Sequence, residues 1–129
     1  MYPLPDDFDL NLLSGCYLET VCFGASSTVL NFSRARSTGE KPYRVSFAVE
    51  GTLSVCVNGA TSYRDFSAPS TAGGLVALVL QDVARLEKLG ASDLKVTFST
   101  GDSLMMDGSA NDAYEQYTVY LDDGDILVV

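Results

Sequence analysis

Residues 43–59 read YRVSFAVEGTLSVCVNG, and this stretch predicts an antiparallel β protein. Val45, Phe47 and Val49 alternate with polar or small residues, which is the period-2 pattern of a half-buried strand. The alternation resumes after a Glu-Gly turn signal, and the closing Asn-Gly pair is a strong short-range signal for a β-hairpin. The stretch therefore predicts two consecutive strands and a third strand that returns beside them.

Similar runs predict further strands along most of the chain. They lie at 16–23, 28–32, 61–66, 94–99, 103–106, 117–121 and 126–129. From Gly73 to Leu89, by contrast, apolar residues recur mostly at i, i+3 and i+4, and Gly90 follows as a natural C-cap, so this segment predicts a helix. The sequence therefore predicts one α+β domain over residues 1–129, a mainly antiparallel twisted sheet or half-barrel with one helix packed on it.

Composition narrows the class of protein. The 129 residues contain no apolar run of the roughly 18 residues that span a bilayer, and the N-terminus lacks the pattern of a secretory signal. Three cysteines, an odd number, suit a reducing compartment, so we expect a cytoplasmic protein. Cys16 and Cys22 are six residues apart and would share one face of a continuous strand, which predicts a buried pair of small apolar side chains.

The chain lacks the residues that most enzymes use. It has no histidine, the commonest general base and transition-metal ligand, and it has no G-x-S-x-G elbow. Residues 122–125, Asp-Asp-Gly-Asp, could begin a calcium loop, but the chain ends four residues later, so a hairpin turn is the better interpretation. We predict no catalytic residue, no metal site and no cofactor.

Charge is distributed unevenly along the chain. The net charge is -9, yet no Lys or Arg occurs in the first 33 residues or after Lys95, and all eight lie between Arg34 and Lys95. Seven carboxylates follow Val96. Such a field attracts basic partners and repels nucleic acid and anionic membranes, although it could equally be a solubilising surface.

Tyrosines stand among the C-terminal acids, and tyrosine with carboxylates is a composition suited to a Lys/Arg-rich partner surface. At strand spacing, we expect at least one of Tyr117 and Tyr120 to be a core residue instead. The candidate partner-binding residues are Asp102, Asp107, Asp112, Tyr114, Glu115, Tyr117, Asp122, Asp123 and Asp125.

Two stretches carry a resemblance to a known family. Residues 13–32, LSGCYLETVCFGASSTVLNF, and the closing YEQYTV (114–119) followed by DDGD resemble a small family of uncharacterised β-rich bacterial proteins. These are similar to immunity proteins of contact-dependent growth inhibition systems, with Tyr117 at the place of the family's tryptophan. The resemblance implies strands with one helix and a role in binding a cognate toxin.

The acidic ends agree with that role, because a nuclease toxin must be basic to hold phosphate. The sequence thus predicts a cytoplasmic immunity protein that neutralises a basic, nuclease-type toxin domain and binds neither nucleic acid nor membrane. Two alternatives remain open: an interaction module that forms a homo-oligomer through a strand edge, and a half-barrel that binds a small molecule.

Overall fold

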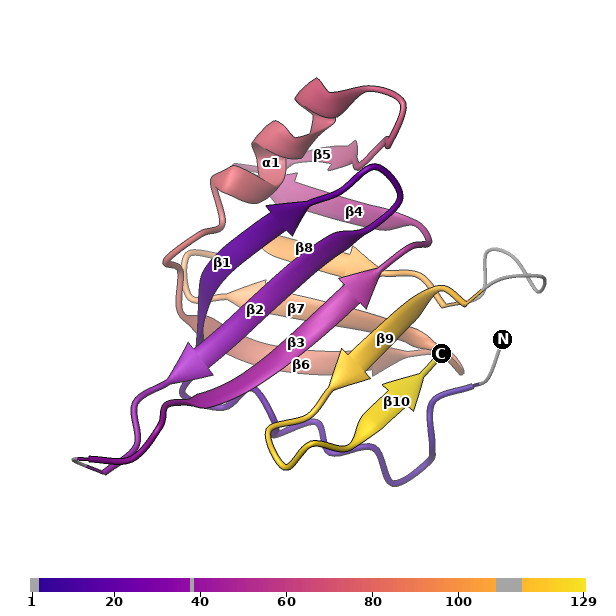
Figure 1. The fold of residues 1–129 in the computed structure, drawn as a ribbon. Coiled ribbons are helices and arrows are strands. Elements are labelled where there is room, and N and C mark those ends of the chain that lie inside the picture. Colours follow the sequence, from indigo (N-terminus) through magenta and orange to yellow (C-terminus); the bar gives the residue numbers. More distant parts are fainter. Residues whose placement is uncertain (1–2, 38, 109–114) are drawn as a thin grey trace.

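A computed structural model describes residues 3–37, 39–108 and 115–129 (Figure 1). The described residues form two antiparallel five-stranded sheets and a short helix, so the predicted β-rich fold is confirmed, but the strands are divided between two sheets. The first sheet has the order β1 (Tyr17–Phe23), β2 (Thr28–Arg34), β3 (Tyr43–Val49), β9 (Tyr117–Tyr120) and β10 (Ile126–Val128). The second has the order β5 (Ala60–Tyr63), β4 (Leu53–Val57), β8 (Ser103–Met106), β7 (Asp93–Phe98) and β6 (Val83–Leu89).

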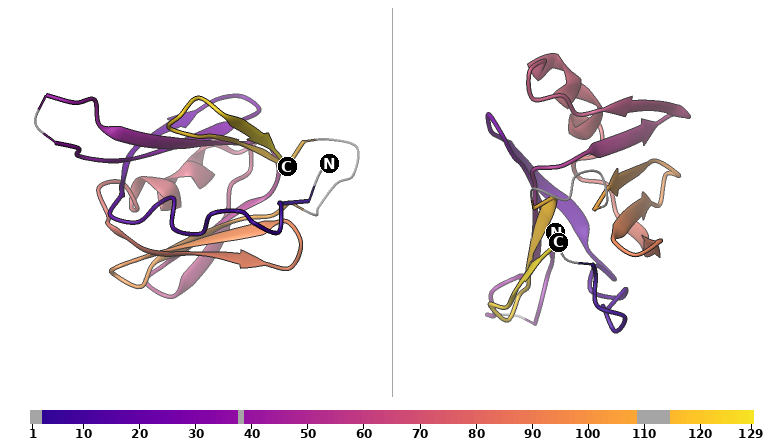
Figure 2. Two further views of the ribbon diagram at one scale, coloured as in Figure 1. Left: turned by 90° about the horizontal axis from the view of Figure 1, so that it is seen from below. Right: turned by 90° about the vertical axis from the view of Figure 1, so that its right-hand side faces the viewer.

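The two sheets lie face to face, and one hydrophobic cluster fills the space between them (Figure 2). The alternation at 43–49 is realised as predicted, because Val45, Phe47 and Val49 are all buried. Phe47 packs edge-on against Phe32 of the neighbouring strand, with ring centroids 5.7 Å apart. The Asn58-Gly59 pair turns β4 into β5 with positive φ at both residues, as a type I′ turn requires.

The chain crosses from the first sheet to the second at Glu50 and Gly51. Their backbone N–H groups both donate to the carbonyl oxygen of Gln116, at 2.9 and 2.8 Å. A Cβ atom at Gly51 would lie 2.3 Å from Oε1 of Gln116, so a larger residue here would require the Gln116 side chain to shift. The crossing point is therefore tied to the segment that leads into β9.

The predicted helix from Gly73 to Leu89 is wrong over most of its length. A 3₁₀ turn, η1 (Pro69–Ala72), leads into α1 (Gly73–Val76), and the residues from Val83 onward form β6. In β6 a bulge at Ala84 places Val83 opposite Phe98 and Leu86 opposite Val96. Because Phe98 and Val96 share a face of β7, the bulge gives two residues of a strand the i, i+3 spacing that resembles a helix.

A second bulge overturns the expectation for the cysteines. In β1, Leu18 pairs with Phe32 but Thr20 pairs with Asn31, so Glu19 is the extra residue. The extra residue reverses the facing of everything after it, as a one-residue shift of register does. Cys16 is consequently buried, whereas Cys22 is exposed.

The N-terminal segment, residues 3–13, runs beneath the open lower end of the two sheets (Figures 1 and 2). Leu4 donates its backbone N–H to the carbonyl oxygen of Ala91, and Leu12 and Leu13 are buried in the common core. In the part of the chain that the structure describes, no helix is long and apolar enough to cross a membrane.

Candidate functional site

A cleft of about 640 Å³ lies between the N-terminal segment and the β9–β10 hairpin. Residues near both ends of the 129-residue chain contribute to it. The described residues that line the cleft are Pro5, Asp7, Phe8, Asp9, Leu12, Tyr43, Leu121, Asp122, Asp123, Asp125, Ile126 and Leu127.

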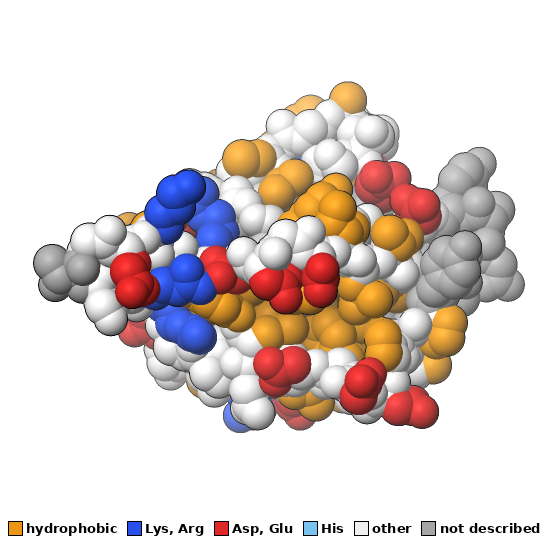
Figure 3. Space-filling view, turned by 60° about the horizontal axis from the view of Figure 1, so that its bottom comes forward, with side chains coloured by type: hydrophobic (Ala, Val, Ile, Leu, Met, Phe, Trp, Pro, Cys, Tyr) orange, Lys and Arg blue, Asp and Glu red, His pale blue; other side chains and the backbone are white. Residues whose placement is uncertain are grey.

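The floor of the cleft is hydrophobic. Phe8, Tyr43, Leu121 and Leu127 are partly buried and pack against the core, so each presents only part of its side chain to solvent. Ile126 stands out from the wall with 60% of its surface exposed. Figure 3 shows this lower face of the molecule, where hydrophobic side chains form a continuous surface bordered by carboxylates. An apolar centre inside a charged rim is the usual anatomy of a protein-binding surface.

The rim of the cleft is acidic on both sides. Asp7 and Asp9 come from the N-terminal segment, and Asp122, Asp123 and Asp125 come from the β9–β10 turn. Two of these carboxylates also shape their own loops: Asp9 accepts the N–H of Asn11 at 2.8 Å, and Asp123 accepts the N–H of Asp125 at 2.9 Å. The 122–125 segment is thus a hairpin turn, as predicted, and it presents its acids to the cleft.

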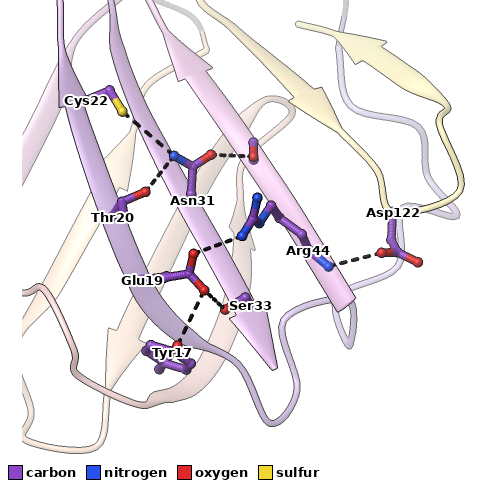
Figure 4. A network of polar contacts seen from close by, with 9 residues as sticks. Tyr17, Glu19, Thr20, Cys22, Asn31, Ser33, Arg44 and Asp122 are labelled. Carbon is purple, nitrogen blue, oxygen red and sulfur yellow. Dashed lines mark hydrogen bonds and ion pairs between the residues drawn. The ribbon is translucent and has the colours of Figure 1, made fainter. Parts of the chain in front are cut away.

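Asp122 is the most firmly held of these acids (Figure 4). Its Oδ1 accepts the backbone N–H of Arg44 at 3.0 Å, and its Oδ2 pairs with the Arg36 guanidinium. The hydrogen bond from the Arg44 N–H lowers the pKa of the Asp122 carboxyl below its ordinary value, and the hydrogen bond and positive charge of Arg36 lower it further. Arg44 in turn pairs with Glu19 at 2.9 Å across the outer face of the first sheet.

Arginines border one end of the cleft, where they hold its wall in place. The Arg34 guanidinium lies 3.8 Å from the centre of the Tyr43 ring and donates to the carbonyl oxygen of Ser14 at 2.5 Å. The Tyr43 hydroxyl donates to the carbonyl oxygen of Leu12 at 2.7 Å. Burial raises the pKa of Tyr43 above its ordinary value, so the phenol remains a neutral donor. These contacts fix the N-terminal segment against β3.

Of the residues proposed from sequence, the structure brings Asp122, Asp123 and Asp125 together in the cleft. Asp102 lies elsewhere, between β7 and β8, where it accepts the N–H of Asn58 at 3.0 Å. Asp107 follows β8, and its carboxyl is a hydrogen-bond partner of Asp93. The carboxylates therefore form separate groups and not the single patch that was predicted.

Tyr117 does not belong to a partner surface, because only 1% of it is exposed. Its hydroxyl donates to the carbonyl oxygen of Ser92 at 2.6 Å, which joins the two sheets. Tyr120 is the exposed member of the pair, so the expectation that one of the two is core is confirmed. Asp112 and Tyr114 lie outside the described residues.

Glu115 lines a second cleft, of about 740 Å³, at the opposite end of the β3–β9 pair. There Glu50 and Asp65 stand near Arg64, whose guanidinium lies 5.4 Å from the Phe23 ring and 5.1 Å from the Phe66 ring. This second cleft carries both signs of charge. The N-terminal cleft is more one-sided, and we take it as the candidate site for that reason.

Sequence reasoning missed the N-terminal half of the site. The lack of Lys and Arg in the first 33 residues was recognised, but no local pattern places Asp7 and Asp9 opposite the β9–β10 turn. The hydrophobic floor was missed too, since Phe8, Leu121 and Leu127 read as ordinary core residues. The uneven charge of both chain ends was the one signal that pointed here.

Among the residues described, no group of three or more Cys, Asp or Glu side chains is arranged to hold a metal ion. In comparisons with models of protein families, with curated proteins and with solved structures, no match to this chain was found. The chemistry of the cleft is therefore the guide to function.

Proposed function

We propose that this protein binds a basic protein partner in the cleft between its N-terminal segment and the β9–β10 hairpin. The observation that carries the proposal is the combination of a hydrophobic floor with five described carboxylates on two opposing walls. The floor offers apolar area for a partner to bury, and the rim selects a partner of positive charge and increases its rate of association.

The specific form of the proposal is an immunity protein that acts in the cytoplasm of the cell that makes the toxin. A nuclease toxin carries Lys and Arg for phosphate, so an acidic cleft would complement its active-site surface and repel nucleic acid. Binding of this kind needs no catalytic group, metal or cofactor from the inhibitor.

The experiment is co-purification with the polypeptide encoded immediately upstream, with affinity measured at about 0.05 M and about 0.5 M NaCl. We expect a stoichiometric complex whose affinity falls steeply as salt increases. The site variant is Asp7→Asn with Asp125→Asn, one carboxylate from each wall, and neither side chain holds a loop. This variant should weaken binding by about tenfold or more, since each neutralised acid removes an attraction near a desolvated surface.

The matched control is Glu50→Gln with Glu115→Gln. It changes the net charge by the same amount but alters the second cleft. If both double variants weaken binding equally, net charge and not the N-terminal cleft is responsible, and the proposed site is wrong. If no complex forms with the site intact, the immunity form of the proposal is wrong.

One observation favours a second candidate function, assembly of identical copies through a sheet edge. β5 lies at the edge of the second sheet, and all four of its residues are exposed. Edge strands of this kind can pair with another chain. Sedimentation at low and high salt separates the two functions, because pairing of β5 edges should produce a dimer that persists in salt.

A further inference from the structure

Ile126 and Leu127 of β10, the last strand of the first sheet, line the acidic cleft. The register of β10 with β9 determines which of its backbone N–H and C=O groups point away from the sheet. Val129 and Tyr117 exchange both backbone hydrogen bonds, at 2.9 and 3.3 Å. Hydrogen-bonded and non-hydrogen-bonded pairs alternate along an antiparallel ladder. The backbone N–H and C=O groups of Leu127 therefore also point toward β9, whereas those of Ile126 and Val128 point away from the sheet.

These outward groups are open within the part of the chain that the structure describes. β10 is the last strand of its sheet, and no described residue donates to or accepts from the backbone of Ile126 or Val128. The N-terminal segment stands across the cleft and makes its hydrogen bonds elsewhere: Leu4 bonds to Ala91 and Phe8 bonds to Pro5. The cleft thus contains an unpaired sheet edge beside its apolar floor.

We propose that the basic partner enters this cleft as an extended segment that pairs with β10 and adds a strand to the first sheet. This inference rests on the proposed function and specifies how the partner is held. Backbone hydrogen bonds to Ile126 would set the position of the segment. Its alternate side chains would then meet the hydrophobic floor and the acidic rim in turn, so a segment that alternates apolar residues with Lys or Arg fits best.

Charge argues for a different chain as the occupant and against a second copy of this one. A second copy that paired β10 with β10 would bring two acidic clefts together, each lined by five described carboxylates, on molecules of net charge -9. Like charges at a strand edge are a known means of preventing self-association. A basic segment would be attracted by these carboxylates, so the edge of β10 is open to a basic chain and closed to a second acidic copy.

The test uses synthetic peptides with the complete protein. The probe is a capped peptide of about seven residues that alternates lysine and valine, and the comparison peptide carries N-methyl groups on its valine amides. Methylation removes backbone donors from one edge of the peptide but retains its charge and side chains. We expect the parent peptide to bind in a salt-dependent manner, the methylated peptide to bind at least about tenfold more weakly, and Asp7→Asn with Asp125→Asn to weaken the parent.

The outcomes separate the binding mode from the binding site. If both peptides bind equally and both lose affinity in the Asp7→Asn, Asp125→Asn variant, the cleft stands and strand addition is overturned. If the parent peptide does not bind at low salt, the inference is overturned, while the proposed function is still decided by the upstream polypeptide.

Substitutions at Ile126 test independently whether the peptide pairs with the backbone of β10. Ile126→Pro removes the outward N–H, whereas Ile126→Ala removes the side chain and retains that N–H. We expect the proline variant to bind the parent peptide several-fold more weakly than the alanine variant. Equal losses would mean that the side chain matters and the backbone edge does not. The methylated peptide supplies the answer should the proline variant fold poorly.

Discussion

At the scale of single residues, the carboxyl of Asp93 has an unusual environment. Its Oδ1 accepts the N–H of Gly108 at 2.9 Å, and Asp107 is its hydrogen-bond partner. Burial and then the neighbouring Asp107 raise the pKa of Asp93 above its ordinary value. The folded protein therefore favours the protonated form of Asp93. The stability from this group is complete below the ordinary pKa of aspartate and is lost as pH increases through the raised value.

We expect Asp93→Asn to stabilise the protein at pH 7, because asparagine resembles the protonated carboxyl and can donate to Asp107. After allowance for solvent screening, the melting temperature should increase by about 3 °C. The gain should shrink as pH falls toward 4, where the wild-type carboxyl itself becomes protonated.

Asp65→Asn is the control for that experiment, since the hydroxyl and then the N–H of Ser67 lower the pKa of Asp65. Stability from Asp65 is present above the ordinary pKa and lost as pH falls, so its neutralisation should lower the melting temperature at pH 7. Thermal melts of both variants from pH 4 to 8 decide the matter. A decrease with Asp93→Asn at pH 7 would contradict the assigned sign.

Tyr117 provides a second test at the residue scale, because sequence reasoning placed it at a partner surface and the structure places it in the core. Tyr117→Phe removes the hydroxyl that donates to Ser92 and leaves that buried carbonyl without its donor. We expect a loss of about 1 to 2 kcal/mol in the free energy of unfolding by urea, with affinity for the basic partner unchanged. If the variant folds stably but binds the partner more weakly, Tyr117 contributes to binding and the core assignment is incomplete.

At the scale of elements, sequence patterns were reliable where a strand was regular and wrong where a bulge interrupted it. The alternation over 43–49 predicted β3 with its observed ends. In β6 the extra residue Ala84 produced helical spacing, and in β1 the extra residue Glu19 reversed the face of Cys22. A bulge is stabilised by the neighbouring strand, so a pattern within one segment does not reveal it.

The strand assignment of 83–89 predicts unequal effects for two leucines that a helix would bury on one face. Leu86 is 6% exposed and points into the core, whereas Leu89 is 38% exposed near the end of β6. Leu86→Ala should cost about 2 to 4 kcal/mol of unfolding free energy, and Leu89→Ala about 1 kcal/mol or less. Equilibrium unfolding in urea measures both. Similar costs would favour the helix.

At the scale of the whole molecule, the candidate site is made by tertiary structure. Asp7 and Asp125 are distant in sequence and meet only because the N-terminal segment closes the lower end of the sheets. Sequence reasoning could find the sign of the charge and the hairpin turn at 122–125, since composition and a turn are local properties. It could not find the opposing wall, the floor or the open edge of β10, because these depend on packing between distant segments.

Like charges gathered around a cleft repel one another and lower the stability of the free protein. The net charge is -9, and five described carboxylates face one another across the cleft, with Arg36 directly paired to only one of them. Their mutual repulsion should destabilise the free protein and should be relieved by salt or by a basic partner.

We therefore expect Asp7→Asn with Asp125→Asn to increase the melting temperature by about 1 to 3 °C at low salt, although the same change weakens partner binding. The increase should disappear near 1 M NaCl, where charges are screened beyond about 3 Å. Glu50→Gln with Glu115→Gln, which changes the net charge equally at the mixed-charge cleft, should give a smaller increase. Thermal melts of the three proteins across a salt series make the comparison. Equal increases would show that repulsion is spread over the surface, whereas a larger increase for the N-terminal cleft would mean that stability has been exchanged there for the capacity to bind a basic chain.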